Sequence, residues 1–164
     1  EFSADFIENK KRMSEISNQI YFKSQKTPAY KPSTFTTDRY LKDGDEFYIV
    51  EYEDRDVQAK PGGFGTDRPI STLKQLREEL SVIYDWKNFE KDNIVLRKYR
   101  VKQGINVAVR DGVIGPVKET NKNSRFFQQI LPGGRRQFEF VDYWGDDWDM
   151  FIEEITSETK YIIK

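Results

Sequence analysis

The sequence predicts an α+β fold, with a compact and mostly antiparallel β-sheet core and about two or three flanking helices. About six or seven segments have the alternation or the β-branched and aromatic content of strands, and most of them lie in the second half of the chain. Tight-turn signals such as Asp111-Gly112 separate neighbouring segments, which favours antiparallel pairing. Helical patterns are few and do not alternate with strands, so a doubly wound sheet is excluded.

The composition indicates one domain with an aromatic core. The chain has 164 residues, of which 37% are hydrophobic and 15% are aromatic, so Phe and Tyr take much of the place of Leu. The net charge of −1 provides no overall basic field, and we therefore expect no nucleic-acid partner.

Cysteine and histidine are both absent from the sequence. This excludes disulfides, thiolate nucleophiles, Ser-His triads and most transition-metal sites, so we expect no bound metal. Any catalysis must use carboxylates, Arg, Gln, hydroxyl groups, Lys or the backbone. No apolar run approaches the roughly 20 residues of a membrane-spanning helix, so we expect no membrane insertion.

The first 37 residues are predicted to form an N-terminal helix and a linker, and residues 38–164 the main domain. Residues 3–23 have a narrow apolar stripe at helical spacing, with Ser3 as a plausible N-cap. This helix either packs on the core or tethers the domain to an upstream region. Residues 24–37 are rich in Lys, Ser, Thr and Pro and are predicted to be a loop.

A strand is predicted over residues 46–53, after a turn at residues 42–45. A long loop over residues 54–69 contains Gly63-Phe64-Gly65-Thr66, where Phe64 is either held over a flat ligand or buried beneath a surface loop. A helix follows over residues 72–84, with Ser71 as its cap.

Further elements are expected in the second half of the chain. They are a strand over residues 94–101, a hairpin of residues 106–110 and 113–117 around Asp111-Gly112, a strand over residues 137–143, a short helix over 148–155 and a last strand over 161–164. The acidic residues between 142 and 149 lack the ligand spacing of a calcium loop, which favours a solvated turn.

Residues 130–141 contain the turn that carries most of the functional prediction. Pro132 is followed by Gly133-Gly134, then by two arginines and Gln137 at the start of a strand. Paired glycines can take positive φ and allow a ligand to approach the bare backbone. With Arg136 beside them, they are suited to a phosphate-bearing ligand at a sheet end, although an ordinary basic loop before a core strand is the alternative.

The order of these motifs resembles a known family. They are Phe47-Tyr48-Ile49-Val50, Gly62-Gly63-Phe64-Gly65-Thr66, a helix with Arg77, Trp86-Lys87-Asn88, Tyr99-Arg100-Val101, a Gly-containing hairpin and Leu131-Pro132-Gly133-Gly134-x-x-Gln137. This order resembles the NAD glycohydrolase toxin domains of the tuberculosis-necrotizing-toxin type, and the related NAD(P)-degrading effectors of polymorphic bacterial toxins. The resemblance covers roughly residues 45–141 and implies a fold shared with ADP-ribosyltransferases and these toxins.

The resemblance also implies a set of site residues. Gln137 matches the Gln implicated in catalysis, and Arg77 matches a helix Arg that contacts the dinucleotide. The residues that would bind the substrate are Arg39, Tyr48, Gly63, Phe64, Thr66, Gly133, Gly134 and Arg136. Relatives tend to have Arg where Ile49 stands, and Arg39 or Arg55 is the candidate substitute.

Glu139 leaves two reactions open. Gln137-x-Glu139 is also the signature of some mono-ADP-ribosyltransferases, in which the Glu bonds a ribose hydroxyl and steadies an oxocarbenium-like transition state. Both classes break the nicotinamide–ribose bond, a reaction that needs no general acid because nicotinamide leaves as a neutral base. A non-enzymatic binding module is a further alternative, and a metal nuclease a distant one.

The resemblance implies NAD+ or NADP+ as substrate, no other cofactor, and a cognate immunity protein as partner. It implies that the chain is a toxin fragment of a secreted bacterial effector that acts in the target cell's cytoplasm.

Overall fold

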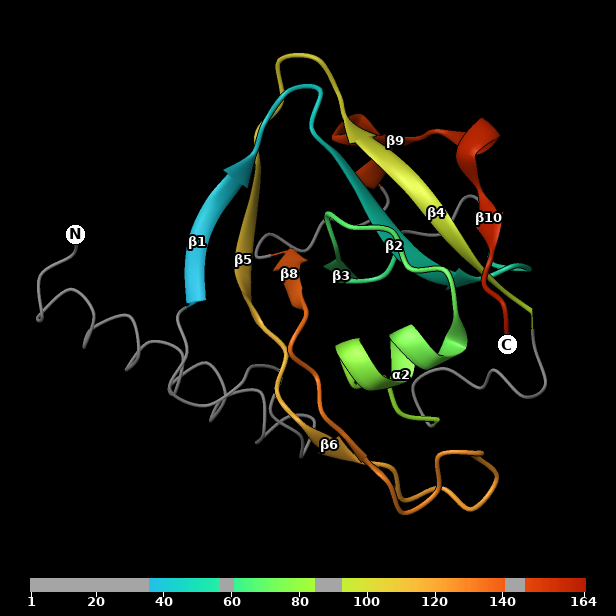
Figure 1. The fold of residues 1–164 in the computed structure, drawn as a ribbon. Helices are drawn as coiled ribbons and strands as arrows, with labels where there is room; N and C mark the ends of the chain where they lie inside the picture. The colour runs from blue at the N-terminus through green and yellow to red at the C-terminus, as the bar shows by residue number, and fades with distance from the viewer. Residues whose placement is uncertain (1–35, 57–60, 85–92, 141–146) are drawn as a thin grey trace, which may run out of the picture. The chain divides into compact units, whose positions relative to one another are not determined.

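The computed structural model describes residues 36–56, 61–84, 93–140 and 147–164. Its sheets are mostly antiparallel, so the predicted α+β class is confirmed (Figure 1). In these ranges the helical structure consists of α2 (Leu73–Leu80) and two 3₁₀ helices, η1 (Trp148–Met150) and η2 (Thr156–Glu158). The helix predicted for residues 3–23 lies outside the described residues. No described helix has the length and apolar character needed to cross a membrane.

The strands form two four-stranded sheets and one two-stranded ladder. The first sheet has the order β1 (Thr36–Leu41), β5 (Val107–Val113), β8 (Arg136–Phe140) and β3 (Phe64–Gly65). The second has the order β10 (Lys160–Tyr161), β4 (Ile94–Val101) and β2 (Glu46–Tyr52), and β9 (Ile152–Glu154) also pairs with β4. The ladder joins β6 (Val117–Lys118) to β7 (Ile130–Leu131).

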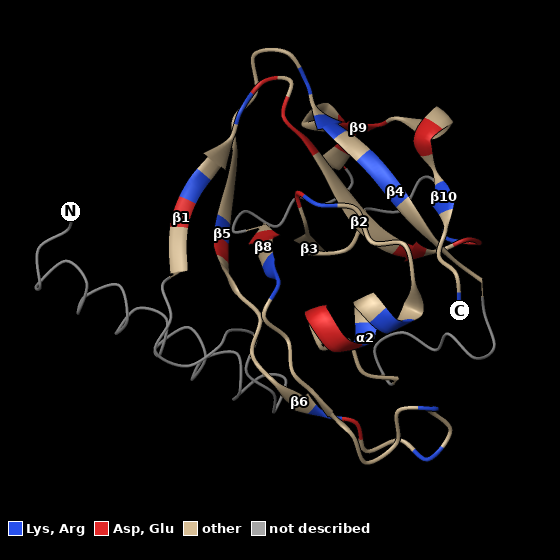
Figure 2. Ribbon diagram, in the orientation of Figure 1, with Lys and Arg blue, Asp and Glu red and all other residues tan. Residues whose placement is uncertain are grey.

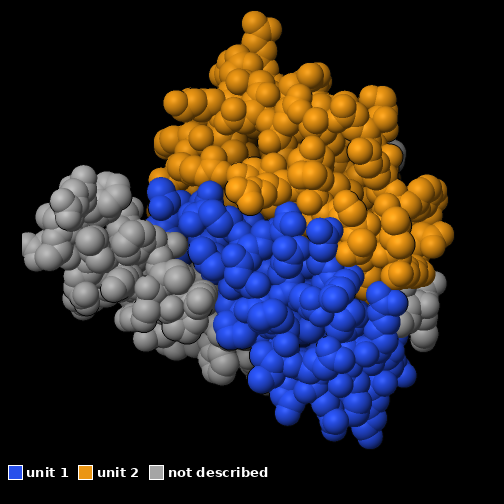
Figure 3. Space-filling view, viewed as in Figure 1, with its two compact units in different colours: residues 1–37, 74–87, 111–137 blue, residues 38–73, 88–110, 138–164 orange. Residues whose placement is uncertain are grey.

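The described chain divides into two compact units, each built from segments that are distant in the sequence (Figure 3). Unit 1 comprises residues 1–37, 74–87 and 111–137, and unit 2 comprises residues 38–73, 88–110 and 138–164. The predicted boundary between residues 37 and 38 stays a prediction.

The core of unit 2 is aromatic, as the composition predicts. The Phe47 ring stacks on Tyr99 with centroids 5.7 Å apart and contacts the edges of Phe138 and Phe140 at 5.8 and 5.5 Å. Such pairs contribute roughly 0.5–1.5 kcal/mol each beyond their buried area. These rings come from β2, β4 and β8, so the core joins strands of both four-stranded sheets.

Two predicted strands are confirmed almost to the residue. β2 covers residues 46–52 of the predicted 46–53, and β4 covers the predicted 94–101. The predicted turn at residues 42–45 is also present, with the Asp45 N–H donating to the Lys42 carbonyl at 2.9 Å. β2 shows strong alternation, and β4 begins with a continuous apolar run. Either pattern identifies the buried residues directly.

The hairpin predicted around Asp111-Gly112 is wrong, because β5 runs straight through both residues. A type I′ turn needs positive φ at both central residues, whereas Gly112 is buried and is not among the glycines with positive φ. Strand β5 lies between β1 and β8 in its sheet. Pairing on both edges therefore overrides the local turn preference.

Three other differences have clear causes. β1 was not predicted, and as an edge strand it shows little alternation, with exposed residues between the buried Thr36 and Leu41. The helix predicted over residues 148–155 is instead η1 followed by β9, which pairs with β4. α2 ends at Leu80 because Ser81 has φ of +50°.

Candidate functional site

Strand β8 gives Gln137 and Glu139 a common face. Phe138 and Phe140 are buried and contribute to the aromatic core. Successive side chains of a strand point to opposite faces, so the half-buried Gln137 and Glu139 lie on the face away from that core. The Gln-x-Glu spacing in the sequence is therefore a spacing of two on one strand face.

The Gly63-Phe64-Gly65-Thr66 segment contributes to the same face. Phe64 pairs with Glu139 and Gly65 with Phe138 across the β3–β8 ladder. Directly opposite residues of an antiparallel pair share a face, so Phe64 lies on the side of Glu139. The prediction of an irregular loop over residues 54–69 is wrong at this point, because β3 lies within it.

Thr66 connects this arrangement to β2. Thr66 and Tyr48 form an antiparallel bridge in which the Tyr48 N–H donates to the Thr66 carbonyl at 2.8 Å and the Thr66 N–H donates back at 2.9 Å. By register, five of the predicted site residues therefore share one face of the paired strands. We call this set the Gln137 face, and it comprises Tyr48, Phe64, Thr66, Gln137 and Glu139.

Lys98 joins this face and was not predicted from sequence. It is the cross-strand partner of Tyr48 on β4, and its Nζ lies 5.7 Å from the centre of the Tyr48 ring. Hydrogen bonds to Glu158 and Glu46, each 2.7 Å long, raise the pKa of Lys98 well above its usual value. Lys98 could not be predicted because the sequence pattern does not encode the β2–β4 register, which places Lys98 beside Tyr48.

The glycines on either side of Phe64 are explained by packing. A Cβ on Gly65 would lie 2.7 Å from the Phe138 ring, so only Gly fits at this strand position. The Gly63 carbonyl accepts a hydrogen bond from the Phe140 N–H at 3.0 Å. Both residues therefore attach the segment to β8, and a contact of Gly63 with the dinucleotide stays a prediction.

In unit 1, Gly133 and Gly134 take the positive φ that the sequence predicts, with values of 72° and 100°. Their N–H groups donate to the carbonyls of Glu78 at 2.7 Å and Ile114 at 2.9 Å. Because these two donors are occupied by protein carbonyls, they do not form an open cradle for a phosphate in this structure. Gly133 docks the turn on the end of α2, and Gly134 bonds it to the residue that follows β5.

Arg77, also in unit 1, is completely buried. Its Nη1 donates to the carbonyl of Val82 at 2.7 Å, so the guanidinium is bonded to the chain that follows α2. The Arg77 side chain is therefore not a surface residue of the helix, and its contact with a dinucleotide stays a prediction. Arg136 is exposed at the start of β8, where its Nε lies 3.2 Å from the Asp111 carboxylate.

The two candidates for the first-strand arginine have different surroundings in unit 2. The guanidinium of Arg39 lies over the Phe138 ring, 5.6 Å from its centre. Phe138 is on the opposite face of β8 from Glu139, so Arg39 reaches the core side of the strand. Arg55 belongs to a buried ion cluster, and neither arginine is placed by the register on the Gln137 face.

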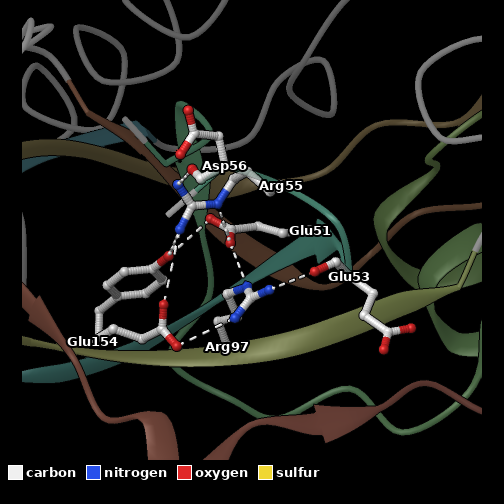
Figure 4. A network of polar contacts seen from close by, with 7 residues as sticks. Glu51, Glu53, Arg55, Asp56, Arg97 and Glu154 are labelled. Atoms are coloured by element: carbon white, nitrogen blue, oxygen red, sulfur yellow. Dashed lines mark hydrogen bonds and ion pairs between the residues drawn. The ribbon is translucent and has the colours of Figure 1, made fainter. Parts of the chain in front are cut away.

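That cluster surrounds Glu51, which is only 2% exposed (Figure 4). Its carboxylate accepts hydrogen bonds from Arg55 Nε at 2.7 Å and from the Tyr99 hydroxyl at 2.9 Å. Arg97 Nε lies 2.9 Å away as an ion pair without hydrogen-bond alignment. Glu154 from β9 completes the cluster, 3.3 Å from Arg97 Nη1 and 3.8 Å from Arg55 Nη2.

The cluster connects three strands and the chain after β2. Two arginines face two carboxylates in it, so its formal charges cancel, and burial together with the Glu51 charge raises the pKa of Tyr99. Arg97 and Arg55 also donate to the carbonyls of Glu53 and Asp56. The arginines are thus used to hold the structure together.

Basic residues lie along β4 (Figure 2), and their charges are also paired with acidic side chains. Arg97, Lys98 and Arg100 each lie against carboxylates of neighbouring elements. Among the described residues no group of acidic side chains is arranged to hold a metal ion.

No protein-family model and no curated protein matches the chain. Among solved structures, that of Tne2 in complex with Tni2 is similar, with 18% identity and a TM-score of 0.59 over 82% of this chain and 98% of that chain. The structure of Tse6 in complex with Tsi6 gives 14% identity and a TM-score of 0.46 over 94% and 98%. The chain therefore has the fold of Tne2. This confirms the resemblance at the level of the fold.

Proposed function

We propose that this chain is an NAD(P)+ glycohydrolase toxin domain, which hydrolyses the nicotinamide–ribose bond and so depletes the dinucleotide of a target cell. The observation that carries the proposal is the register that gathers Gln137, Glu139 and Phe64 on one strand face. The similarity in fold to Tne2 supports the class of protein. The absence of His and Cys from the sequence also agrees with a reaction that needs neither.

The proposed reaction requires charge stabilisation more than proton transfer. The C1′–N bond breaks, its electron pair stays on nicotinamide, and positive charge develops at C1′. The Glu139 carboxylate would stabilise that charge, and Gln137 would orient the water whose oxygen bonds to C1′ and whose proton is released to solvent. The aromatic rings of Phe64 and Tyr48 would hold the nicotinamide. The products are nicotinamide and ADP-ribose, or its phosphate from NADP+.

The test is to incubate the purified chain with NAD+ and with NADP+ and to follow nicotinamide and ADP-ribose by chromatography. We expect both products in equal amounts from the unmodified protein, and a loss of about 100-fold or more in Gln137→Ala. Gln103→Ala, which changes an exposed Gln in a loop, is the matched control. Undiminished activity of Gln137→Ala would remove Gln137 from the mechanism.

A mono-ADP-ribosyltransferase is the second candidate, favoured by the shared face of Gln137 and Glu139 on β8. In that reaction a protein side chain replaces water as the nucleophile at C1′. Labelled NAD+ with a cell lysate separates the two reactions, because a transferase leaves the label on protein and a hydrolase leaves it on free ADP-ribose. No NAD+ binding at all would support the non-enzymatic alternative.

The proposal extends to partners and location. As a toxin, the domain would be secreted, act in the cytoplasm of its target and be neutralised by a cognate immunity protein. The similarity to Tne2, solved in complex with Tni2, supports such a partner. Expression in bacteria should therefore stop growth and lower cellular NAD+, and Gln137→Ala should relieve both effects.

A further inference from the structure

The end of helix α2 holds the turn that precedes Gln137. Within unit 1, the N–H groups of Gly133 and Arg135 donate to the carbonyls of Glu78 and Glu79 at 2.7 and 3.1 Å. These carbonyls belong to the last turn of α2, where carbonyl groups have no hydrogen-bond partner within the helix. The turn therefore acts as a C-terminal cap for α2 that comes from another part of the chain.

Ser81 holds the same turn through its side chain. Its hydroxyl oxygen lies 2.8 Å from the carbonyl oxygen of Gly115 and 3.1 Å from that of Leu131. Gly115 lies two residues before β6 and Leu131 is the last residue of β7, which pairs with β6. The single hydroxyl proton of the buried Ser81 is therefore shared between carbonyls of the two paired segments.

The backbone of Ser81 indicates that this contact is maintained at a cost. Its φ of +50° lies in the left-handed region, which is unfavourable for a residue with a Cβ. A Gly at this position would take the same conformation without strain and end the helix equally well. Since Ser is present instead, and its hydroxyl is bonded on both sides, the hydroxyl is the feature that distinguishes this residue.

We propose that Ser81 is a positioning residue for the reaction at Gln137. By holding Gly115 and Leu131 against the end of α2, it keeps the Gly133-Gly134 turn in the conformation from which β8 begins, and so determines where Gln137 lies along its strand. The inference rests on the proposed function, and the role that it gives Ser81 is exerted through the turn.

The test is Ser81→Gly, which removes the hydroxyl and keeps a residue suited to positive φ. Ser124→Gly is the matched control, because Ser124 is also buried in unit 1 and its hydroxyl accepts a hydrogen bond from the Phe126 N–H, at the far end of the same hairpin. Turnover of NAD+ is measured at a temperature at which both variants are folded by circular dichroism. Hydrogen exchange of the Gly133 and Arg135 amides is followed in parallel.

We expect kcat to fall about tenfold or more in Ser81→Gly, with KM within about twofold, because displacement of a catalytic group by about 1 Å can cost about 100-fold. Exchange at the Gly133 and Arg135 amides should accelerate in this variant alone. An unchanged kcat, or an equal loss in Ser124→Gly, would overturn the proposal. If the unmodified protein cleaves no NAD(P)+, the proposed function fails, and so does the role of Ser81 in positioning Gln137 for that reaction. The exchange data then decide by themselves whether Ser81 holds the turn.

Discussion

Replacing Glu51 with Ala is predicted to destabilise the protein more than any exposed ion-pair substitution. The carboxylate is 2% exposed and lies between 2.7 and 2.9 Å from Arg55, Arg97 and the Tyr99 hydroxyl. Its removal leaves two largely buried guanidinium groups close together, with Glu154 as their remaining acidic partner in the cluster. Breaking a buried ion pair from one side costs about 3–5 kcal/mol.

That cost is large in comparison with the stability of a domain, which is about 5–15 kcal/mol. For a chain of this size, 1 kcal/mol corresponds to about 2–4 °C in Tm, so Glu51→Ala should lower Tm by about 6–20 °C. Glu51→Gln keeps the volume and one acceptor oxygen but loses the charge. It should therefore cost less, about 1–3 kcal/mol.

Urea titration with linear extrapolation measures these differences directly, with thermal melting as a second probe. Glu153→Ala is the matched control, since Glu153 pairs with Arg100 on the same sheet but both side chains are nearly half exposed. It should cost no more than about 1 kcal/mol. If Glu51→Ala costs no more than Glu153→Ala, the cluster does not hold β2, β4 and β9 together as argued.

Three further predictions concern the same core and the glycines. Burial, and then the Glu51 charge, raise the pKa of Tyr99, so its hydroxyl stays protonated in the folded state above pH 10. In the unfolded chain the same hydroxyl ionises near pH 10. Stability is therefore full below about pH 10 and falls above it, by up to about 1.4 kcal/mol per pH unit, and Tyr99→Phe should flatten this fall in urea titrations from pH 9 to 11.5. Gly133→Ala should cost clearly more than Gly134→Ala by thermal melting. Both have positive φ, but only a Cβ at Gly133 meets a backbone oxygen, at 2.5 Å. Gly65→Ala should lower stability by about 1–3 kcal/mol through overpacking against the Phe138 ring, and a melting temperature equal to that of the unmodified protein would contradict this packing.

The parts of the fold that sequence predicted are those in which a single segment determines its own burial. β2 and β4 have patterns that identify their buried faces, and both were placed within a residue. The prediction of a hairpin at Asp111-Gly112 was wrong for the opposite reason, because the pairing of β5 with strands from elsewhere in the chain determines the conformation of these residues. The prediction of a helix over residues 148–155 was wrong for a similar reason, since the three residues of β9 become a strand by pairing with β4.

For the candidate site, residue types were easier to predict than spatial relations. Gln137 and Glu139 could be placed on one strand face, because a spacing of two is visible in the sequence. The pairing of Phe64 with Glu139 and the bridge from Thr66 to Tyr48 depend on register between distant segments. No periodicity encodes that register, and for the same reason Lys98 was missed.

The paired glycines show that a single sequence feature can have two physical causes. A glycine that admits a ligand and a glycine that admits another stretch of backbone look alike in sequence, and both favour positive φ. Here the amides of Gly133 and Gly134 are bonded to protein carbonyls, and a Cβ on Gly133 would meet the Ile114 carbonyl. These glycines are therefore required by the fold whether or not a dinucleotide binds. It follows that a chain of this fold that had lost its activity would keep Gly133 and be free to lose Gln137, so Gln137 is the residue that separates the proposed enzyme from a binding module.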